Sequence, residues 1–418
     1  MYVSSYKIRW LKIMDNLEEE IRIEVMNQID LSYDVTDEEI LQIIKNSIIN
    51  HSKIKPISLL ERQKIESHVF NSLRKLDVLE DLLADEEITE IMINGPDRIF
   101  IEKSGQVIRS NERFSSEEKL NDIIQNIVAS TNKIVNESNP IVDTRLSDGS
   151  RVNIVLKPAA VDYSILSIRK FPKEQMTMDR LESYGSISRE QIEFLRKLVK
   201  AGYNIFVSGG TGSGKTSFLN ALGEFIPEDE RVITIEDSAE LQLKKVENLV
   251  RLEARNANLE GKNEITIRDL LKSSLRMRPD RIIVGECRGA EALEMLQAFN
   301  TGHDGSCSTG HSNSCKDMLS RLETMVLMGA EIPLPAIRQQ IASGIDIIVQ
   351  LGRLRDKSRK LLEIAEVDGI ENNEIKLNCL YRFKEISETG GRIVGQWEKV
   401  GKLIHTEKLL ASGISLET

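Results

Sequence analysis

A glycine-rich loop is the clearest place in this sequence where residue types and spacing could do chemistry. Residues 209–216 match GxxxxGK[ST], with an apolar run at 203–207 before them and a helical pattern after them. Glycines let the backbone approach a phosphate, amides at a helix start point at the anion, the lysine reaches the outer phosphates and the hydroxyl ligates Mg²⁺. We therefore predict a bound nucleoside triphosphate, with a flexible connector as the alternative. The predicted binding residues are Gly209, Gly210, Thr211, Gly212, Ser213, Gly214, Lys215, Thr216 and Ser217.

Carboxylates follow two β-branched runs, each where a strand would end. Glu236, Asp237 and Glu240 come after VITI, and Glu286 comes after RIIVG. Because the carboxyl ends of parallel strands line one crevice, these acids can converge on Lys215 although they are distant in sequence. Acids at strand ends are often only helix caps. Hydrolysis of a nucleotide, however, needs carboxylates to place Mg²⁺ and to orient water, so we favour a functional role.

Histidine and cysteine alternate every fourth residue in the segment NTGHDGSCSTGHSNS. On one helix, His303, Cys307, His311 and Cys315 would form a plausible metal face, but the intervening glycines break such a helix. No zinc site is expected. We interpret the segment as a nucleotide-sensing or catalytic loop in which His311, and less surely His303, approach the site, with local structural polar residues as the alternative.

Arginines of the preceding region could supply further positive charge to a phosphate in transit. Arg145 and Arg151 lie in DTRLSDGSRVNIV, and Arg169 lies in LSIRKF. An arginine at a strand end is usually a solvated surface charge, so their closeness to the expected domain boundary is only suggestive.

The elements that must position these residues fall into an N-terminal and a C-terminal half. The first 75 or so residues have helical spacing, with capping pairs at Thr36 and Glu39 and at Ser58 and Glu61. A meander of strands follows from about residue 85, then a helix expected to begin with Ser115 and Glu118, then two more strands at RVNIVLKP and YSILSIRKF. This order indicates a small α+β domain.

A polar stretch after Phe171-Pro172-Lys173 is expected to be a linker with a hinge. Ser188 then begins a helix, and strand and helix signals alternate to about Leu351, which is typical of a mainly parallel sheet. Beyond it, a hairpin around Asp356-Lys357-Ser358 and a closing helix at 403–410 are expected.

Composition describes an ordinary globular chain with an acidic balance. The 418 residues include 56 Lys and Arg against 66 Asp and Glu, for a formal net charge of −10. A protein that neutralises nucleic-acid phosphates by bulk charge is normally basic, so no nucleic-acid partner is expected. At roughly 100–200 residues per domain, the length indicates two or three domains.

The start of the chain, its hydropathy and its cysteines indicate a compartment. Residues 1–20 mix charged and apolar side chains, unlike a signal peptide, and no apolar run approaches the roughly 20 residues that span a bilayer. The cysteines form no CxxC pair, which favours free thiols in a reducing cytosol. We expect a soluble cytoplasmic protein that meets the cell membrane only peripherally, at its cytoplasmic face.

Four separated motifs, SGGTGSGKTS, ITIEDSAELQL, LRMRPDRIIVGECRGAEALEMLQAFNTGHDG and STGHSNS, resemble the secretion ATPase family of type II and type IV secretion and type IV pilus assembly. The similarity looks closest to the CpaF/TadA branch of tight-adherence pilus ATPases, and it runs from about Leu79 to about Leu351. The resemblance implies an α/β fold in which a RecA-like P-loop ATPase domain is preceded by a small α+β PAS-like domain and an N-terminal helical region. The expected boundaries are 1–78 for the helical region, 79–172 for the PAS-like domain, 173–188 for the linker and 189–418 for the ATPase domain.

The resemblance also implies roles for individual residues. Glu240 takes the catalytic position in an acidic box with Glu236 and Asp237, and Glu286 is the Walker B acid that holds Mg²⁺ through water together with Thr216. His303 and His311 match a His box, and Arg151 and Arg169 match arginines that reach the γ-phosphate. Departures at Cys287, Cys307, Gly310 and Ser312 affect the expected geometry of the histidine loop.

We therefore expect a homo-hexameric, Mg²⁺-dependent ATPase that drives a polytopic membrane platform, with pilin or secreted protein as indirect cargo. Two alternatives remain from other classes. One is a nucleic-acid-translocating motor on the same core, and the other is a nucleotide-regulated scaffold that does not hydrolyse ATP.

Overall fold

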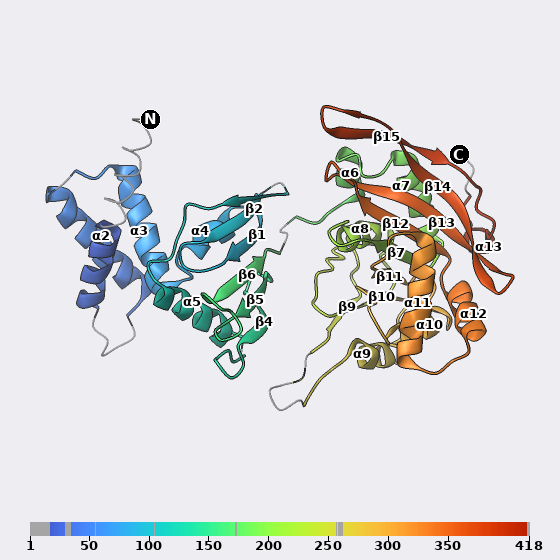
Figure 1. Cartoon of the computed structure of the whole chain (residues 1–418), viewed down its shortest axis with the longest axis horizontal. Coiled ribbons are helices and arrows are strands. Elements are labelled where there is room, and N and C mark those ends of the chain that lie inside the picture. Colours follow the sequence, from blue (N-terminus) through green and yellow to red (C-terminus); the bar gives the residue numbers. More distant parts are fainter. Residues whose placement is uncertain are drawn as a thin grey trace. The chain divides into compact units, whose positions relative to one another are not determined.

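The computed structural model describes residues 17–29, 35–54, 56–103, 105–131, 133–171, 174–255, 257 and 262–415. The chain forms two compact units, Met1–Pro172 and Lys173–Thr418, which are described separately (Figure 1). The hinge was expected within the stretch 173–188, of which Lys173 lies outside the described residues. Within the described part of the chain, no helix is both long and apolar enough to cross a membrane.

The first unit begins with helices that pack around a small apolar core. Both expected capping pairs are confirmed: the Thr36 amide donates to Glu39 Oε2 at 2.9 Å, and Ser58 and Glu61 cap each other's backbone. Ile44 and Ile65 lie fully buried in the core that these helices share. Residues 17–28 are helical, and the helices after them are α2 (Asp37–Ile54), α3 (Leu59–Arg74) and α4 (Leu79–Ala84).

A six-stranded antiparallel sheet with one covering helix completes the first unit. The strand order is β3-β2-β1-β6-β5-β4, and α5 lies along the sheet (Figure 1). The buried residues of α5 form one apolar stripe, Leu120, Ile123, Ile124, Ile127 and Val128. Its N-cap is Ser116 rather than the expected Ser115, because Ser116 accepts a hydrogen bond from the backbone amide of Lys119. The elements are β1 (Ile88–Ile93), β2 (Ile99–Lys103), β3 (Gln106–Arg109), α5 (Glu117–Ala129), β4 (Ile141–Arg145), β5 (Arg151–Val155) and β6 (Ile165–Arg169).

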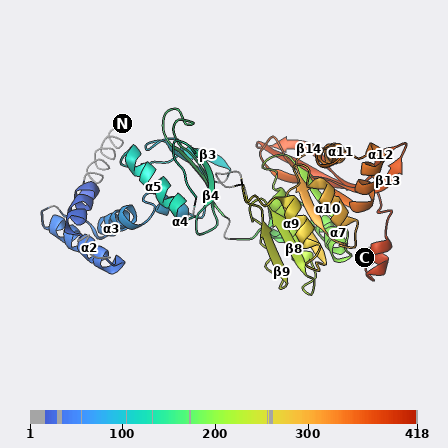
Figure 2. The same cartoon turned by 90° about the horizontal axis from the view of Figure 1, so that it is seen from below.

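A nine-stranded sheet organises the second unit. Strands β12, β7, β11, β10, β8 and β9 are parallel neighbours in that order, and β13, β14 and β15 extend the sheet antiparallel beyond β12. Figure 2 shows β8 and β9 apart from β13 and β14. The strands are β7 (Ile205–Gly209), β8 (Val232–Glu236), β9 (Leu249–Glu253), β10 (Arg281–Val284), β11 (Cys307–Gly310), β12 (Ile347–Arg353), β13 (Arg359–Glu371), β14 (Glu374–Thr389) and β15 (Arg392–Lys399).

Helices cover both faces of this sheet, so its central strands are buried on both sides. Alternate residues of β7 enter different cores: Ile205 and Val207 pack with α7 and α8, whereas Phe206 packs with α9 to α12. The helices are α6 (Met178–Ser183), α7 (Arg189–Lys200), α8 (Lys215–Leu222), α9 (Ile267–Ser274), α10 (Ala292–Phe299), α11 (Cys315–Gly329), α12 (Leu334–Gly344) and α13 (Glu407–Ala411), with a 3₁₀ turn at Gly223–Phe225.

Several expectations for the second unit need correction. The stretch expected to be a linker is folded from Thr177 onward, where α6 begins and Met178 enters the core. The hairpin around 356–358 is confirmed, since β12 pairs antiparallel with β13, but β9, β14 and β15 were not anticipated. The closing helix is α13, which is shorter than expected.

Cys287, Cys307 and Cys315 are buried free thiols, and no group of three metal-ligating side chains occurs among the described residues.

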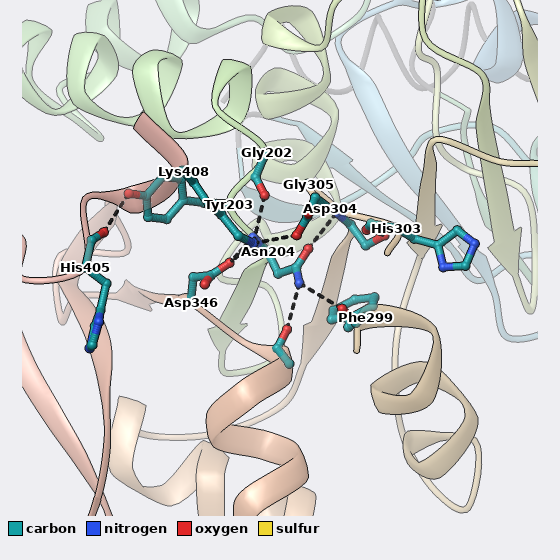
Figure 3. Close-up of polar contacts among 12 residues, drawn as sticks. Gly202, Tyr203, Asn204, Phe299, His303, Asp304, Gly305, Asp346, His405 and Lys408 are labelled. Atoms are coloured by element: carbon teal, nitrogen blue, oxygen red, sulfur yellow. Dashed lines mark hydrogen bonds and ion pairs between the residues drawn. The ribbon is translucent and has the colours of Figure 1, made fainter. Parts of the chain in front are cut away.

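Polar contacts tie α13 to the start of the parallel strands (Figure 3). Lys408 Nζ lies 2.8 Å from Asp346 Oδ2 and 2.7 Å from Asp304 Oδ1, and it donates to the Gly202 carbonyl at 3.1 Å. Asp346 Oδ2 also accepts a hydrogen bond from the backbone N–H of Asn204 at 2.7 Å. Burial raises the pKa of Asp346, and Lys408 opposes that rise. Lys408 therefore offsets the cost of burying Asp346, whereas Asp304, whose side chain is largely exposed, adds a second ion pair.

Replacing Lys408 with Met should loosen this end of the second unit, because Asp346 and Asp304 lose their shared cation. We expect the free energy of unfolding to fall by about 1–3 kcal/mol and the amides of α13 to exchange hydrogen faster. Denaturant unfolding and hydrogen exchange measure these two quantities. Lys402→Met, at an exposed lysine of the same segment, is the control. A Lys408→Met protein with wild-type stability and protection would contradict this role.

Candidate nucleotide-binding site

The glycine-rich loop leaves a central strand of the second sheet and ends in a helix. β7 lies between β12 and β11, and α8 begins at Lys215. Gly212 and Gly214 have φ of +71° and +94°, a conformation that favours glycine. A Cβ on Gly209 would lie 2.7 Å from the Leu351 carbonyl oxygen, so a side chain there would collide with β12. The strand, the left-handed glycines and the helix start together form the expected phosphate-binding geometry.

Lys215 is buried and directed back over its own loop. Its ammonium donates to the carbonyls of Gly209 and Gly210 at 3.1 and 3.2 Å, and it lies 3.3 Å from His311 Nδ1. Burial lowers the pKa of Lys215, and the Glu286 carboxylate opposes that shift. These weak carbonyl partners leave the ammonium available to exchange them for a more strongly charged phosphate oxygen.

His311 lies between Lys215 and Glu286. Its Nε2 lies 2.7 Å from Glu286 Oε1, while its Nδ1 faces Lys215. Burial and the Lys215 charge lower the pKa of His311, which favours the neutral ring at neutral pH. In the neutral ring, Nδ1 can accept from the Lys215 ammonium, which leaves the ring proton on Nε2, the side that faces Glu286. Among the described residues, Glu286 Oε1 has no hydrogen-bond partner.

Arg288 joins the two acidic strand ends. It donates to Glu286 Oε2 from Nε at 2.8 Å and to Asp237 Oδ2 from Nη1 at 3.2 Å. Asp237, Arg288, Glu286, His311 and Lys215 thus form one connected chain of charged and polar contacts. The structure brings the ends of β7, β8, β10 and β11 together as the parallel-sheet argument expects.

The Glu236 side chain is buried in the second unit and does not face the solvent, where a ligand would bind. It is only 4% exposed, and its carboxylate accepts the amides of Glu240 and Leu241 at 2.8 and 3.1 Å. Burial raises its pKa to about 7. Gly285 provides the space, because a Cβ there would lie 2.7 Å from Glu236 Cγ. Glu236 is therefore an anchor that fixes the backbone of Glu240, and its expected role as a cofactor-binding residue is corrected.

The other predicted residues have distinct positions. Thr216 and Ser217 lie in the first turn of α8, and the side chain of Glu240 is partly exposed on the loop that Glu236 anchors. The Thr216 hydroxyl and the Glu286 carboxylate are oxygen donors of the kind that Mg²⁺ prefers, so the residues present fit a hydrated Mg²⁺ ion.

His303 does not join the site of its own chain, which corrects that expectation. It precedes β11, whereas His311 follows that strand, so the two histidines lie at opposite ends of β11. The His303 ring contacts the Ala298 carbonyl oxygen at 3.0 Å and the Thr301 hydroxyl at 3.4 Å. Spacing in the sequence could not reveal which end of a four-residue strand each histidine would occupy.

The arginines of the first unit lie side by side on neighbouring strands. Arg151 of β5 is directly opposite Arg169 of β6 and opposite Arg145 of β4. Residues opposite one another on adjacent strands project from the same face of a sheet, so three guanidinium groups share one face.

Two contributors to the site were not anticipated. Arg288 stands two residues after Glu286 in GECRG, and its position beside an acid was the available signal. Arg359 of β13 donates from Nε to the Gly212 carbonyl at 2.8 Å, although 147 residues separate the two. Only the register of β12 and β13 brings it there, and no local pattern indicates that register.

Comparison with known proteins agrees with this geometry. The pattern of the family described as "Type II/IV secretion system protein" matches residues 72–394. A Mycobacterium tuberculosis protein named for conjugal transfer is 34% identical over 294 residues, covering 69% of this chain and 83% of that protein. The type IV secretion system protein PtlH of Bordetella pertussis is 32% identical over 322 residues, covering 71% and 95%.

Among solved structures, the ATPase DotB of Yersinia pseudotuberculosis has a TM-score of 0.51 at 19% identity, over 70% of this chain and 78% of that chain. At this identity the likeness concerns the fold. The expected α/β fold class is confirmed.

The raised pKa of Glu236 predicts a pH dependence of stability. Between its ordinary pKa near 4.5 and its folded pKa of about 7, the folded protein holds a proton that the unfolded chain has released. Stability from this group therefore falls as pH rises through that window and stays low above it. Relative to Glu236→Gln, wild type should lose about 2–3 kcal/mol of unfolding free energy from about pH 5 to about pH 8.

Denaturant unfolding of both proteins across that range measures the difference, and groups common to both cancel. Glu228→Gln, at an exposed carboxylate before β8, is the matched control and should track wild type. Parallel stability curves for wild type and Glu236→Gln would rule out the buried, proton-binding carboxylate.

Proposed function

The chain belongs to the type II/IV secretion system protein family, and from that membership we propose that it hydrolyses ATP to power a type II/IV secretion or pilus machine. The observation that carries the proposal is the contact chain that runs from Lys215 through His311 and Glu286 to Arg288 and Asp237. In it, Lys215 and Glu286 contact opposite nitrogens of the His311 imidazole, which supports roles for them as phosphate-binding lysine and Walker B acid. Phosphate-binding loops without adjacent acids would support binding alone.

Each residue has a defined part in the reaction. Lys215 and the loop amides bind the phosphates, Thr216 and Glu286 hold the hydrated metal, and Glu240 orients the attacking water. When bound, Mg²⁺ neutralises charge on the phosphate oxygens. Water adds to the γ-phosphorus, the bond from that phosphorus to the bridging oxygen breaks, and ADP and inorganic phosphate are the products.

His311 and Arg288 would make the site responsive to the γ-phosphate. If Lys215 binds a phosphate oxygen instead of His311, then His311 loses one of its two partners. The contact between His311 and the Glu286 carboxylate would change as a result. Arg151 and Arg169, opposite each other on neighbouring strands, would supply two guanidinium groups to the γ-phosphate.

The finer features of the machine are part of the same proposal. We propose a homo-hexameric, Mg²⁺-dependent motor, and from the resemblance of its sequence motifs we assign it to the CpaF/TadA branch that serves a tight-adherence pilus. It would work at the cytoplasmic face of the cell membrane on a polytopic platform protein, with pilin or secreted protein as indirect cargo. The formal net charge of −10 weighs against a nucleic-acid motor.

Glu240→Gln should separate binding from hydrolysis. The amide cannot accept a proton from water, so we expect nucleotide affinity near wild type and a kcat lower by about 100-fold or more. Lys215→Ala should instead weaken nucleotide binding by about 10-fold or more, because it removes a charged partner of the phosphates. Phosphate release and binding of a fluorescent ADP analogue measure the two effects.

Glu247→Gln, at an exposed carboxylate beyond the acidic loop, is the control for the first variant. Unchanged steady-state hydrolysis in Glu240→Gln would refute the assignment of Glu240. A wild-type protein that binds ATP but releases no phosphate in a single turnover would favour the scaffold.

Isolation of the complex in mild detergent tests the proposed platform. We expect a polytopic membrane protein to accompany the full-length chain, and mass spectrometry identifies it. The same purification from cells that carry an unrelated tagged cytoplasmic protein is the control. If both preparations contain the same membrane proteins, the platform is not supported.

A further inference from the structure

Two arginines of the β12–β13 hairpin stand beside the phosphate-binding loop. Strand β12 runs parallel to β7, and Leu351 of β12 is opposite Gly209, the last residue of β7. The loop departs there, whereas β12 continues to Arg353 before the chain turns and returns as β13 at Arg359. Arg353 and Arg359 are directly opposite in the antiparallel pair, so their side chains leave the same face.

Arg359 contacts the part of the loop that joins β7 to α8, and Arg353 lies near it. Arg359 Nε donates to the Gly212 carbonyl at 2.8 Å, and Arg359 Cδ lies 3.6 Å from the position that a Cβ on Gly214 would take. Arg353 Nη1 lies 4.0 Å from the corresponding position on Gly212. The hairpin therefore covers the outside of the loop at its two left-handed glycines.

The contact of Arg359 fixes the orientation of one peptide group. In a trans peptide the carbonyl and the following N–H point in opposite directions, so holding Gly212 O outward directs the Ser213 N–H inward. The Ser213 amide indeed lies 3.3 Å from the Gly210 carbonyl oxygen across the loop. Loop amides directed inward are the groups that bind phosphate in such loops.

The charge of these arginines is not balanced by the protein. Among residues that the structure describes, neither Arg353 nor Arg359 has an acidic side chain within ion-pair distance. Arg355 of the same turn, by contrast, pairs with Glu385 and with Glu388 of β14. Arg353, Arg359 and Lys215 thus place three positive charges around one short loop, an arrangement that an anion in the loop would stabilise.

We propose that Arg359 is a positioning residue that presets the phosphate-binding loop, and that Arg353 and Arg359 together raise its affinity for the phosphates of ADP and ATP. The proposal rests on nucleotide binding by the loop but not on hydrolysis. It links the C-terminal antiparallel extension of the sheet to nucleotide affinity.

Binding of a fluorescent ADP analogue to the full chain tests the proposal. Arg359→Ala should raise the Kd about 10-fold or more, since hydrogen bonds from charged groups are among the stronger polar contacts. Arg353→Ala should raise it less, and Arg359→Lys should fall between wild type and Arg359→Ala because it keeps the charge but loses the Nε–H geometry. KM for ATP should rise by more than kcat falls.

Two further readouts distinguish the proposed role from general damage to the hairpin. Arg355→Ala removes a neighbouring charge that Glu385 and Glu388 already compensate, and it should bind ADP like wild type. The double variant Arg353→Ala and Arg359→Ala should show an ADP affinity that depends less steeply on salt than the wild-type affinity does, because two uncompensated charges are gone.

The outcomes separate this proposal from the proposed function. Wild-type ADP affinity in Arg359→Ala, or an equal loss in Arg355→Ala, overturns the role of Arg359 while the motor stands. Salt dependence unchanged in the double variant overturns the electrostatic part. If the wild-type chain binds ADP but does not hydrolyse ATP, the proposed ATPase function is wrong. The Kd values for ADP then still decide whether Arg359 has the proposed role.

Discussion

The Glu286 carboxylate is the contact on which the arrangement of the site depends. One of its oxygens faces His311 at 2.7 Å, and the other accepts from Arg288 at 2.8 Å, so it joins the phosphate-binding side to the acidic side. These contacts exist because four parallel strands end at one edge and deliver Lys215, Asp237, Glu286 and His311 together.

A second, buried carboxylate supports this arrangement from below. Glu236 gives up contact with solvent to hold two backbone amides, and Gly285 leaves the space that it fills. Burial disfavours the charged carboxylate and therefore raises its pKa, while its hydrogen bonds hold the backbone at Glu240 in place. Acids that are adjacent in sequence thus have different tasks, because one points into the core and the others point out of it.

Local sequence signals predicted much of this fold, and distant contacts set the limit. Thr36 with Glu39, Ser58 with Glu61 and the stripe of α5 depend on neighbours a few residues apart, so their patterns were readable. Strand β14 alternates Ile375, Leu377 and Cys379 with polar residues, which is a strand pattern that the sequence prediction did not use. His303 and Arg359 depend on strand ends and register, which only the assembled sheet defines.

The long strands at the C-terminal side of the sheet have a mechanical consequence. β14 contains 16 residues and β12 only 7, so at about 3.3 Å per residue the outer strand spans roughly 50 Å against roughly 23 Å for the strand beside the phosphate loop. Antiparallel pairing, interrupted by bulges, joins β12 through β13 and β14 to β15, so a rotation of β12 would also move the outer strands. A rotation of about 5° at β12 would move the tip of β14 by a few ångströms, which is a stroke of useful size produced far from the bound phosphates.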